Sequence, residues 1–173
     1  MLWNELGEQS CSFARTLSVI GDRWMLLILR DCFMAVRRFD DFHERLGIAR
    51  PILTDRLRKL TETGVLAKIP YQTRPTRYEY RLTDKGLDLY PIIMGIVHWG
   101  DMHMTSGKGR PLLHRHVACG HVFDPVTTCS ECGEPVTARD VKILLGPGAD
   151  DKDHLPPALR PARVADSGGT RDD

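Results

Sequence analysis

Two short helical patterns, separated by only a few residues, constrain this chain more than any other feature of its sequence. The first lies at residues 39–46 (FDDFHERL) and is closed by Gly47, a residue with which helices often end. The second begins at RPILTDRLRKL and ends at Gly64, and its apolar residues recur at helical spacing: Leu53, Leu57 and Leu60. Two helices joined so tightly indicate a helix-turn-helix.

The residues that follow predict a β-hairpin. Apolar residues alternate in VLAKIPY and again in RYEYRL, and the turn-rich sequence QTRPT separates the two stretches. Helices are also expected over residues 12–20 and over RWMLLILRDCFM, the second capped by Asp22. After the hairpin, Thr83 is expected to cap a long helix that reaches about Met104 with a kink at Pro91. The predicted fold class is therefore mainly α with a small β-hairpin wing, a winged helix-turn-helix.

Three parts are expected along the chain. Residues 1–106 would form the winged helix-turn-helix with its dimerisation elements, and residues 107–146 carry a cluster of Cys and His. Residues 147–173 hold almost no large apolar side chains, so we predict a disordered tail there. Within the long last helix, the stripe expected to be buried consists of Leu87, Tyr90, Met94, Val97 and His98.

The charge of the whole chain is uninformative at +1, but the charge is unevenly distributed. Between Arg45 and Arg81 there are nine Lys or Arg residues against three acidic residues. Local charge of one sign favours a polyanionic partner, with a merely solvated face as the alternative. Because this charge coincides with the helix-turn-helix and the hairpin, we expect double-stranded DNA as the partner.

The second helix of a helix-turn-helix supplies the base contacts. With its leucines turned inward, the residues predicted to face the DNA bases are Pro51, Thr54, Asp55 and Arg58. Arg58 can donate two hydrogen bonds to guanine, Thr54 can touch a thymine methyl group or a phosphate, and Asp55 can accept from a cytosine amine.

Other cationic residues are expected to contact the DNA backbone, which positions a protein without reading sequence. The predicted phosphate contacts of the helix-turn-helix are Arg37, Arg38, Arg50 and Lys59. At the tip of the wing, Arg74 and Arg77 flank a proline and can enter the minor groove or grip its backbone. Arg50 also stands where a Ser or Asp usually caps a helix, so that cap is expected to be unsatisfied or to be made by a phosphate.

Three runs of sequence resemble the HxlR-type branch of the MarR-like winged-helix transcriptional regulators: CSFARTLSVIGDRWMLLILRD, RRFDDFHERLGIARPILTDRLRKLTETGVL and RYEYRLTDKGLDLYPIIMGIVHWGD. The resemblance covers about residues 10–105. It implies a homodimer, joined through the N-terminal helix and the last helix of the winged-helix domain, that binds an inverted-repeat operator as a repressor or an activator. It departs from the family at Arg50, so the operator sequence does not follow from it.

Cys11 stands where members of this family carry a cysteine near the start of the first helix. In some relatives that residue senses oxidants or electrophiles, so the resemblance implies the same candidate role here. The dipole of a helix favours a thiolate at its N-terminus, which raises reactivity. The alternative is a small buried hydrophobic residue, the commonest role of a free cysteine.

Residues 114–135 (HRHVACGHVFDPVTTCSECGEP) contain two similar halves: His116-x-x-Cys119-Gly and Cys129-x-x-Cys132-Gly. Each half has the spacing of a zinc knuckle, and two knuckles together predict a structural Zn²⁺ site of three Cys and one His in a small zinc-ribbon-like segment. His121 is the rival fourth ligand, followed by His114. The alternatives are a redox pair of Cys129 and Cys132 and a loop without metal.

The rest of the sequence favours a cytoplasmic protein that is not an enzyme. Five cysteines, three of them clustered, are not typical of a secreted disulfide framework, and MLWNELGEQSC does not resemble a secretory signal. The longest apolar run, Met25–Leu29, is far shorter than the roughly 20 residues that span a membrane. Besides a DNA-binding regulator, two other classes of protein stay open: a thiol redox protein, and an adaptor whose winged helix binds protein.

Overall fold

The computed structural model describes residues 3–149 and divides the chain into two compact units. Residues 19–126 form the larger unit, and the described part of the other comprises residues 3–18 and 127–149. The predicted tail at 147–173 lies largely outside the described residues. Within residues 3–149, no helix has both the length and the apolar character needed to cross a membrane.

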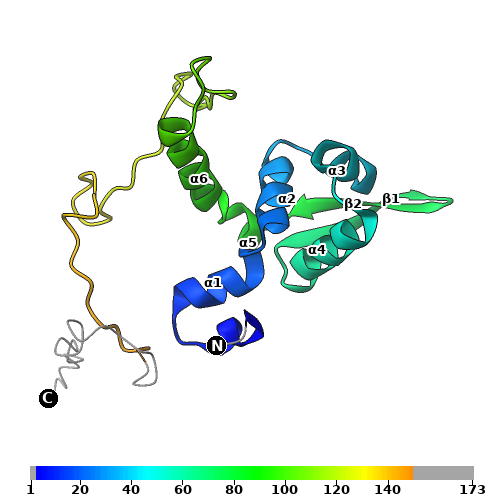
Figure 1. The fold of residues 1–173 in the computed structure, drawn as a ribbon, viewed down its shortest axis with the longest axis horizontal. Coiled ribbons are helices and arrows are strands. Elements are labelled where there is room, and N and C mark those ends of the chain that lie inside the picture. The colour runs from blue at the N-terminus through cyan, green and yellow to red at the C-terminus, as the bar shows by residue number, and fades with distance from the viewer. Residues whose placement is uncertain (1–2, 150–173) are drawn as a thin grey trace, which may run out of the picture. The chain divides into compact units, whose positions relative to one another are not determined.

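Three helices form the helical core of the larger unit: α2 (Arg23–Phe33), α3 (Phe39–Leu46) and α4 (Arg50–Glu62) (Figure 1). As predicted, α3 ends at Gly47 in the left-handed conformation, and Asp22 caps α2 by accepting a 2.9 Å hydrogen bond from the backbone N–H of Trp24. The leucine stripe of α4 is fully buried and packs with Phe42 of α3 and Ile28 of α2. The helix-turn-helix prediction is therefore confirmed.

The predicted hairpin forms from β1 (Leu66–Thr73) and β2 (Thr76–Leu82), which pair antiparallel and project beyond the helices (Figure 1). Only Arg74 and Pro75 lie between the strands, so the turn is tighter than QTRPT suggested, and the register shifts near Tyr71. The base of the hairpin is tied to the helical core because the backbone N–H of Tyr80 donates to the carbonyl of Arg37 over 2.8 Å.

The prediction of one long last helix was wrong. The chain forms a single turn, α5 (Asp84–Leu87), capped by Thr83 as predicted, and then a separate helix, α6 (Tyr90–His103). The proline ring at position 91 would clash with the carbonyl of Leu87 in a continuous helix, and the residue instead takes its favoured place in the first turn of α6.

This break also exposes the first two residues of the stripe that was expected to be buried. Leu87 and Tyr90, expected in the buried stripe, are 51% and 38% exposed. Met94 is buried as predicted, and the last two residues of the stripe are half-buried, but Ile93 is buried as well and joins the core of the larger unit. The prediction failed at Leu87 and Tyr90 because it assumed one uninterrupted helix.

The segment after α6 contains no further helix or extended strand among the described residues, and it is built from turns and isolated β-bridges. In the smaller unit, the described elements are the 3-10 helix η1 (Trp3–Glu8) and most of α1 (Ser12–Ile20), whose bounds match the prediction.

Candidate nucleic-acid interface

The outward face of α4 carries polar and charged side chains above its buried leucines. Pro51, Thr54, Arg58 and Lys59 are exposed and Asp55 is half-buried. Ile52, which was not among the predicted contacts, also lies on this helix with 39% of its surface exposed. The geometry therefore brings the predicted base-reading residues onto one accessible face.

Ion pairs cover much of that face. Asp55 accepts hydrogen bonds from Arg58 at 2.6 Å and from Arg56 at 2.5 Å, and it lies 3.3 Å from the Lys59 ammonium group. The hydrogen bond from Arg58, joined by those from Arg56 and Lys59, lowers the pKa of the Asp55 carboxyl to about 2. On its other side, Arg58 donates to both carboxylate oxygens of Glu62, at 2.7 and 2.8 Å.

The N-terminus of α4 differs from the prediction by one residue. Ala49 takes the cap position, no side chain caps the helix, and Arg50 is its first helical residue. The Arg50 guanidinium donates to Asp40 of α3 at 2.9 Å, and it lies 5.4 Å from the ring of Phe39. The uncapped end presents backbone N–H groups, which attract anions.

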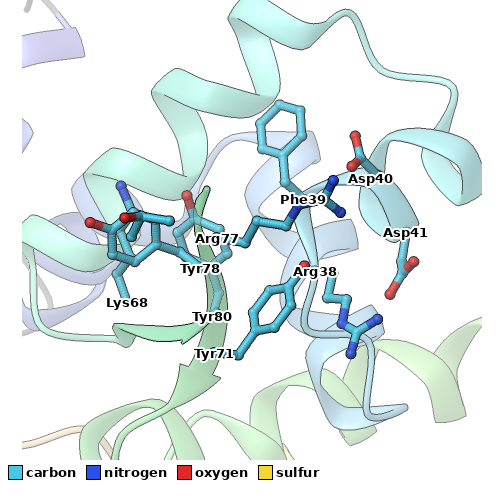
Figure 2. A pocket seen from close by; sticks show the side chains of 10 residues that line it. Arg38, Phe39, Asp40, Asp41, Lys68, Tyr71, Arg77, Tyr78 and Tyr80 are labelled. Carbon is cyan, nitrogen blue, oxygen red and sulfur yellow. The ribbon is translucent and has the colours of Figure 1, made fainter. Parts of the chain in front are cut away.

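A hollow of about 500 Å³ lies between the start of α3 and the wing (Figure 2). Two predicted DNA contacts meet there, Arg38 from α3's cap position and Arg77 from β2. The Arg38 guanidinium stacks on the Tyr71 ring at 4.6 Å, and the Lys68 ammonium group lies 4.2 Å from the centre of the Tyr78 ring. Lys68, Tyr71 and Tyr78 were missed as site residues because the strand alternation alone does not show which wing face adjoins α3.

The remaining predicted DNA contacts lie outside this hollow. Arg74 is exposed at the tip of the wing, between β1 and β2. Arg37 is exposed and borders a second hollow, lined by residues of the α2 end, β2 and α5. Arg37 and Arg38 are adjacent in sequence but open onto different surfaces, which the sequence alone did not indicate.

A buried carboxylate, also missed, supports the first helix of the pair. Asp31 of α2 is completely buried, and its oxygens accept from Arg30 at 2.8 Å and from Arg45 of α3 at 3.3 Å. Its position inside an apolar helical stretch was the available signal, because a buried carboxylate needs partners. This pair links α2 to α3.

Cys11 is exposed and directly precedes α1. Its carbonyl accepts from the backbone N–H of Arg15 at 3.0 Å, so the thiol lies at the N-terminal end of the helix, as predicted. Among the described residues all five cysteines are free thiols.

The two predicted metal-binding halves have the same backbone geometry. In the first, the N–H of His116 donates to the carbonyl of His121, and that of Gly120 donates back to His116. In the second, the N–H of Cys129 donates to the carbonyl of Glu134, and that of Gly133 donates back to Cys129. Both glycines have positive φ, near 75°, a conformation that glycine adopts readily.

Within each half, the candidate ligands lie together. His116 Nδ1 and Cys119 Sγ are 3.3 Å apart, and backbone N–H groups of Cys132 and Glu131 directed at the Cys129 sulfur hold the pKa of that thiol below its ordinary value. The two halves belong to different compact units. Within residues 3–149, no three His, Cys, Asp or Glu side chains form a group that could hold a metal ion, so the zinc site stays a prediction.

Comparisons with known proteins agree with this fold. An HxlR-like helix-turn-helix family model matches residues 19–108. The chain is 46% identical over 137 residues to Rv3095 of Mycobacterium tuberculosis, an uncharacterised HTH-type transcriptional regulator, a match that covers 79% of this chain and 87% of the relative.

Two solved structures are also similar. The crystal structure of PA1607 matches with a TM-score of 0.71 and 36% identity, covering 79% of this chain and 96% of that one. The redox regulator HypR in its oxidised form matches with a TM-score of 0.52 and 30% identity, covering 56% of this chain and 100% of that one. With a helix-turn-helix, a wing and this match over half its length, the chain belongs to the HxlR-like helix-turn-helix family and is a DNA-binding transcriptional regulator.

Proposed function

We propose that α4 lies in the major groove of an operator and that the hollow between α3 and the wing grips the adjoining DNA backbone. The observation that carries this proposal is the exposed row of α4 residues above buried leucines, next to a hollow lined by Arg38, Lys68 and Arg77. Arg58 and Thr54 contact bases, while Arg38, Arg50, Lys59, Arg74 and Arg77 hold phosphates. Arg37, which borders the second hollow, holds a separate phosphate.

Binding measured against salt concentration tests this proposal. Several phosphate contacts release counterions, so affinity should fall steeply and linearly on a logarithmic plot as salt rises. Arg74→Ala should reduce that slope and weaken binding to every sequence alike, whereas Arg58→Ala should relax specificity at one position per half-site. Salt-independent binding to a protein target, with no bound duplex, would favour the adaptor alternative.

The protein functions, in this proposal, as a homodimer on an inverted-repeat operator. An apolar face of α6 supports this: Ile92, Ile96, Trp99 and Met102 are between 42% and 59% exposed. Phe13 of α1 is 73% exposed. Exposed apolar patches of this kind mark interfaces in soluble proteins. Sedimentation of Ile96→Glu beside the wild type tests it, because a charge on this face should yield monomers and leave the helix content unchanged.

Zinc is the proposed cofactor of residues 114–135. The support is the shared backbone geometry of the His116 and Cys129 halves and, in the second half, the N–H groups of Glu131 and Cys132 directed at the Cys129 sulfur, an arrangement that suits a thiolate ligand. His116, Cys119, Cys129 and Cys132 would form a closed set of four ligands, which suits a structural role. When bound, the metal would accept thiolate and imidazole ligands, and this ligation would contribute to the free energy of folding of the segment.

Cys11 is the proposed sensor of oxidants or electrophiles. Its support is an exposed thiol at the start of α1 and the similarity to HypR, a redox regulator. A mild oxidant should change the operator affinity of the wild type, and Cys11→Ser should abolish that change while binding normally when reduced. Cys32→Ser is a suitable comparison, because burial raises the pKa of the Cys32 thiol to about 12 and makes it unreactive. A response that persists in Cys11→Ser would overturn the assignment.

A further inference from the structure

The contacts of Arg58 are unequal, and that inequality suggests how the reading face of α4 works. Its guanidinium lies between two carboxylates, Asp55 on the preceding turn and Glu62 on the following one. A base contact requires Arg58 to free two N–H donors toward the DNA. At least one of the two carboxylates must therefore release it.

Asp55 is the anchored partner of the two. Its carboxylate also accepts from Arg56, which donates at 3.1 Å to each oxygen of Asp22. Asp22 is held in turn as the cap of α2. This chain of contacts connects the Arg58 side chain to the helical core.

Glu62 is the unanchored partner. Its side chain is 57% exposed, and among residues 3–149 only Arg58 donates hydrogen bonds to it. Asp55, by contrast, is 33% exposed and contacts three cationic groups. Separating Arg58 from Glu62 therefore disturbs one exposed pair, whereas separating it from Asp55 disturbs the whole network.

We infer that Asp55 is a positioning residue that holds Arg58 for one base, and that the base displaces Glu62 from the guanidinium. Asp55 binds through Nη2, and Glu62 binds through Nη1. When Glu62 withdraws, Nη1 and the second hydrogen of Nη2 supply the two donors that guanine O6 and N7 accept. Because one carboxylate stays bound, less side-chain freedom is lost on contact with DNA.

This inference rests on the proposed function of α4, and it gives Asp55 a different role from the cytosine contact predicted from the sequence. An Asp55 carboxylate already engaged by three cationic side chains has little acceptor capacity left for a base. Its low pKa, which results first from the Arg58 hydrogen bond, shows that it stays ionised. Asp55 thus affects specificity through Arg58.

Selection of bound sequences from random duplex DNA, repeated with variants, tests the inference. Arg58→Ala should lose about 5- to 150-fold discrimination at one position per half-site. Asp55→Ala should weaken discrimination at that same position, and the double variant should be no less selective than Arg58→Ala alone. Glu62→Gln should keep the preference and bind at least as tightly. Glu44→Gln removes the same charge from an exposed position of α3 and should leave selectivity unchanged.

Each contrary outcome has a distinct meaning. If Asp55→Ala relaxes a different position from Arg58→Ala, Asp55 reads its own base and the inference is wrong. It is also wrong if Asp55→Ala changes no position while its thermal unfolding matches the wild type, or if Glu62→Gln loses the preference. If Arg58→Ala relaxes no position at all, the proposed reading face of α4 fails instead.

Discussion

The winged helix and the segment that follows α6 are held together in opposite ways. From Ile20 to Ile93 the chain buries one connected cluster of apolar side chains, which includes Leu53, Leu57 and Leu60. Beyond Met94, no residue up to 149 is buried, and the turns around Gly120 and Gly133 are held by backbone hydrogen bonds. The winged helix therefore has an apolar core of its own, whereas the segment after α6 consists of turns without a core.

This difference teaches which interactions each region needs. Apolar burial stabilises the winged helix with no added component. The turns around Gly120 and Gly133 bury no side chain, so packing contributes little to their order, and the zinc proposed above would add to the order that their backbone hydrogen bonds supply. The two regions should therefore respond differently to the same perturbation.

Metal removal should produce the largest difference. Protein purified without added metal should hold about one zinc per chain, and Cys129→Ser should lose both the metal and the order of residues 114–135, because zinc contributes about 10 to 16 kcal/mol in small zinc-binding peptides. Elemental analysis and amide hydrogen exchange measure the two effects. Cys11→Ser, the exposed thiol outside the cluster, should keep its zinc.

Metal-free protein with protected amides in both turns would contradict this prediction. So would a reversible Cys129–Cys132 disulfide, which would favour the redox alternative. If His121→Ala loses the zinc while His116→Ala keeps it, the site stands with a different fourth ligand.

Truncation of a buried side chain should have the next largest effect, and that effect should be confined to the winged helix. Leu57→Ala removes a fully buried side chain and should lower the free energy of unfolding of the winged helix by about 2 to 5 kcal/mol. Ile52→Ala on the same helix, where 39% of the residue is exposed, should cost less than about 1 kcal/mol. Denaturant unfolding followed by circular dichroism compares them, and an equal loss in both would show that α4 does not pack as described.

The smallest expected effect concerns pH. Burial alone would raise the pKa of Asp22, but hydrogen bonds from Arg56 and the Trp24 backbone outweigh it and hold the pKa below its ordinary value. This stabilisation is therefore fully present above the unfolded pKa of about 3.9 and is lost as pH falls through the lower folded pKa.

Asp22→Asn keeps a capping side chain and loses the charge. It should lower the free energy of unfolding at pH 7 by less than about 1 kcal/mol, because the pair is partly exposed, and the difference from the wild type should shrink in acid. Urea unfolding from pH 7 to about pH 2, below the ordinary pKa of a carboxyl, measures it. A difference that is constant across this range would assign the effect to the cap instead of the charge.

The elements that depend on local sequence pattern were predicted correctly from the sequence. Leucine spacing and Gly47 defined the helix-turn-helix, and alternation defined the hairpin. The break between α5 and α6 was missed because Pro91 can either kink a helix or begin one, and only packing of Ile93 against the core decides. The hollow beside α3 and the ion pairs of Arg58 depend on contacts between turns and elements, which periodicity does not encode.

Asp22 gives the molecule an evolutionary constraint. The same carboxylate caps α2 and anchors, through Arg56, the network that reaches Arg58. If Arg58 and Thr54 contact bases as proposed, a lineage that acquires a new operator can exchange them on the surface of α4 with little cost to folding. Exchange of Asp22 would alter both stability and the placement of Arg58, so a change at this position would require a compensating change. Among regulators of this kind that bind different operators, the amino-acid differences should therefore concentrate on the outer face of α4, and the aspartate that supports this face should be retained.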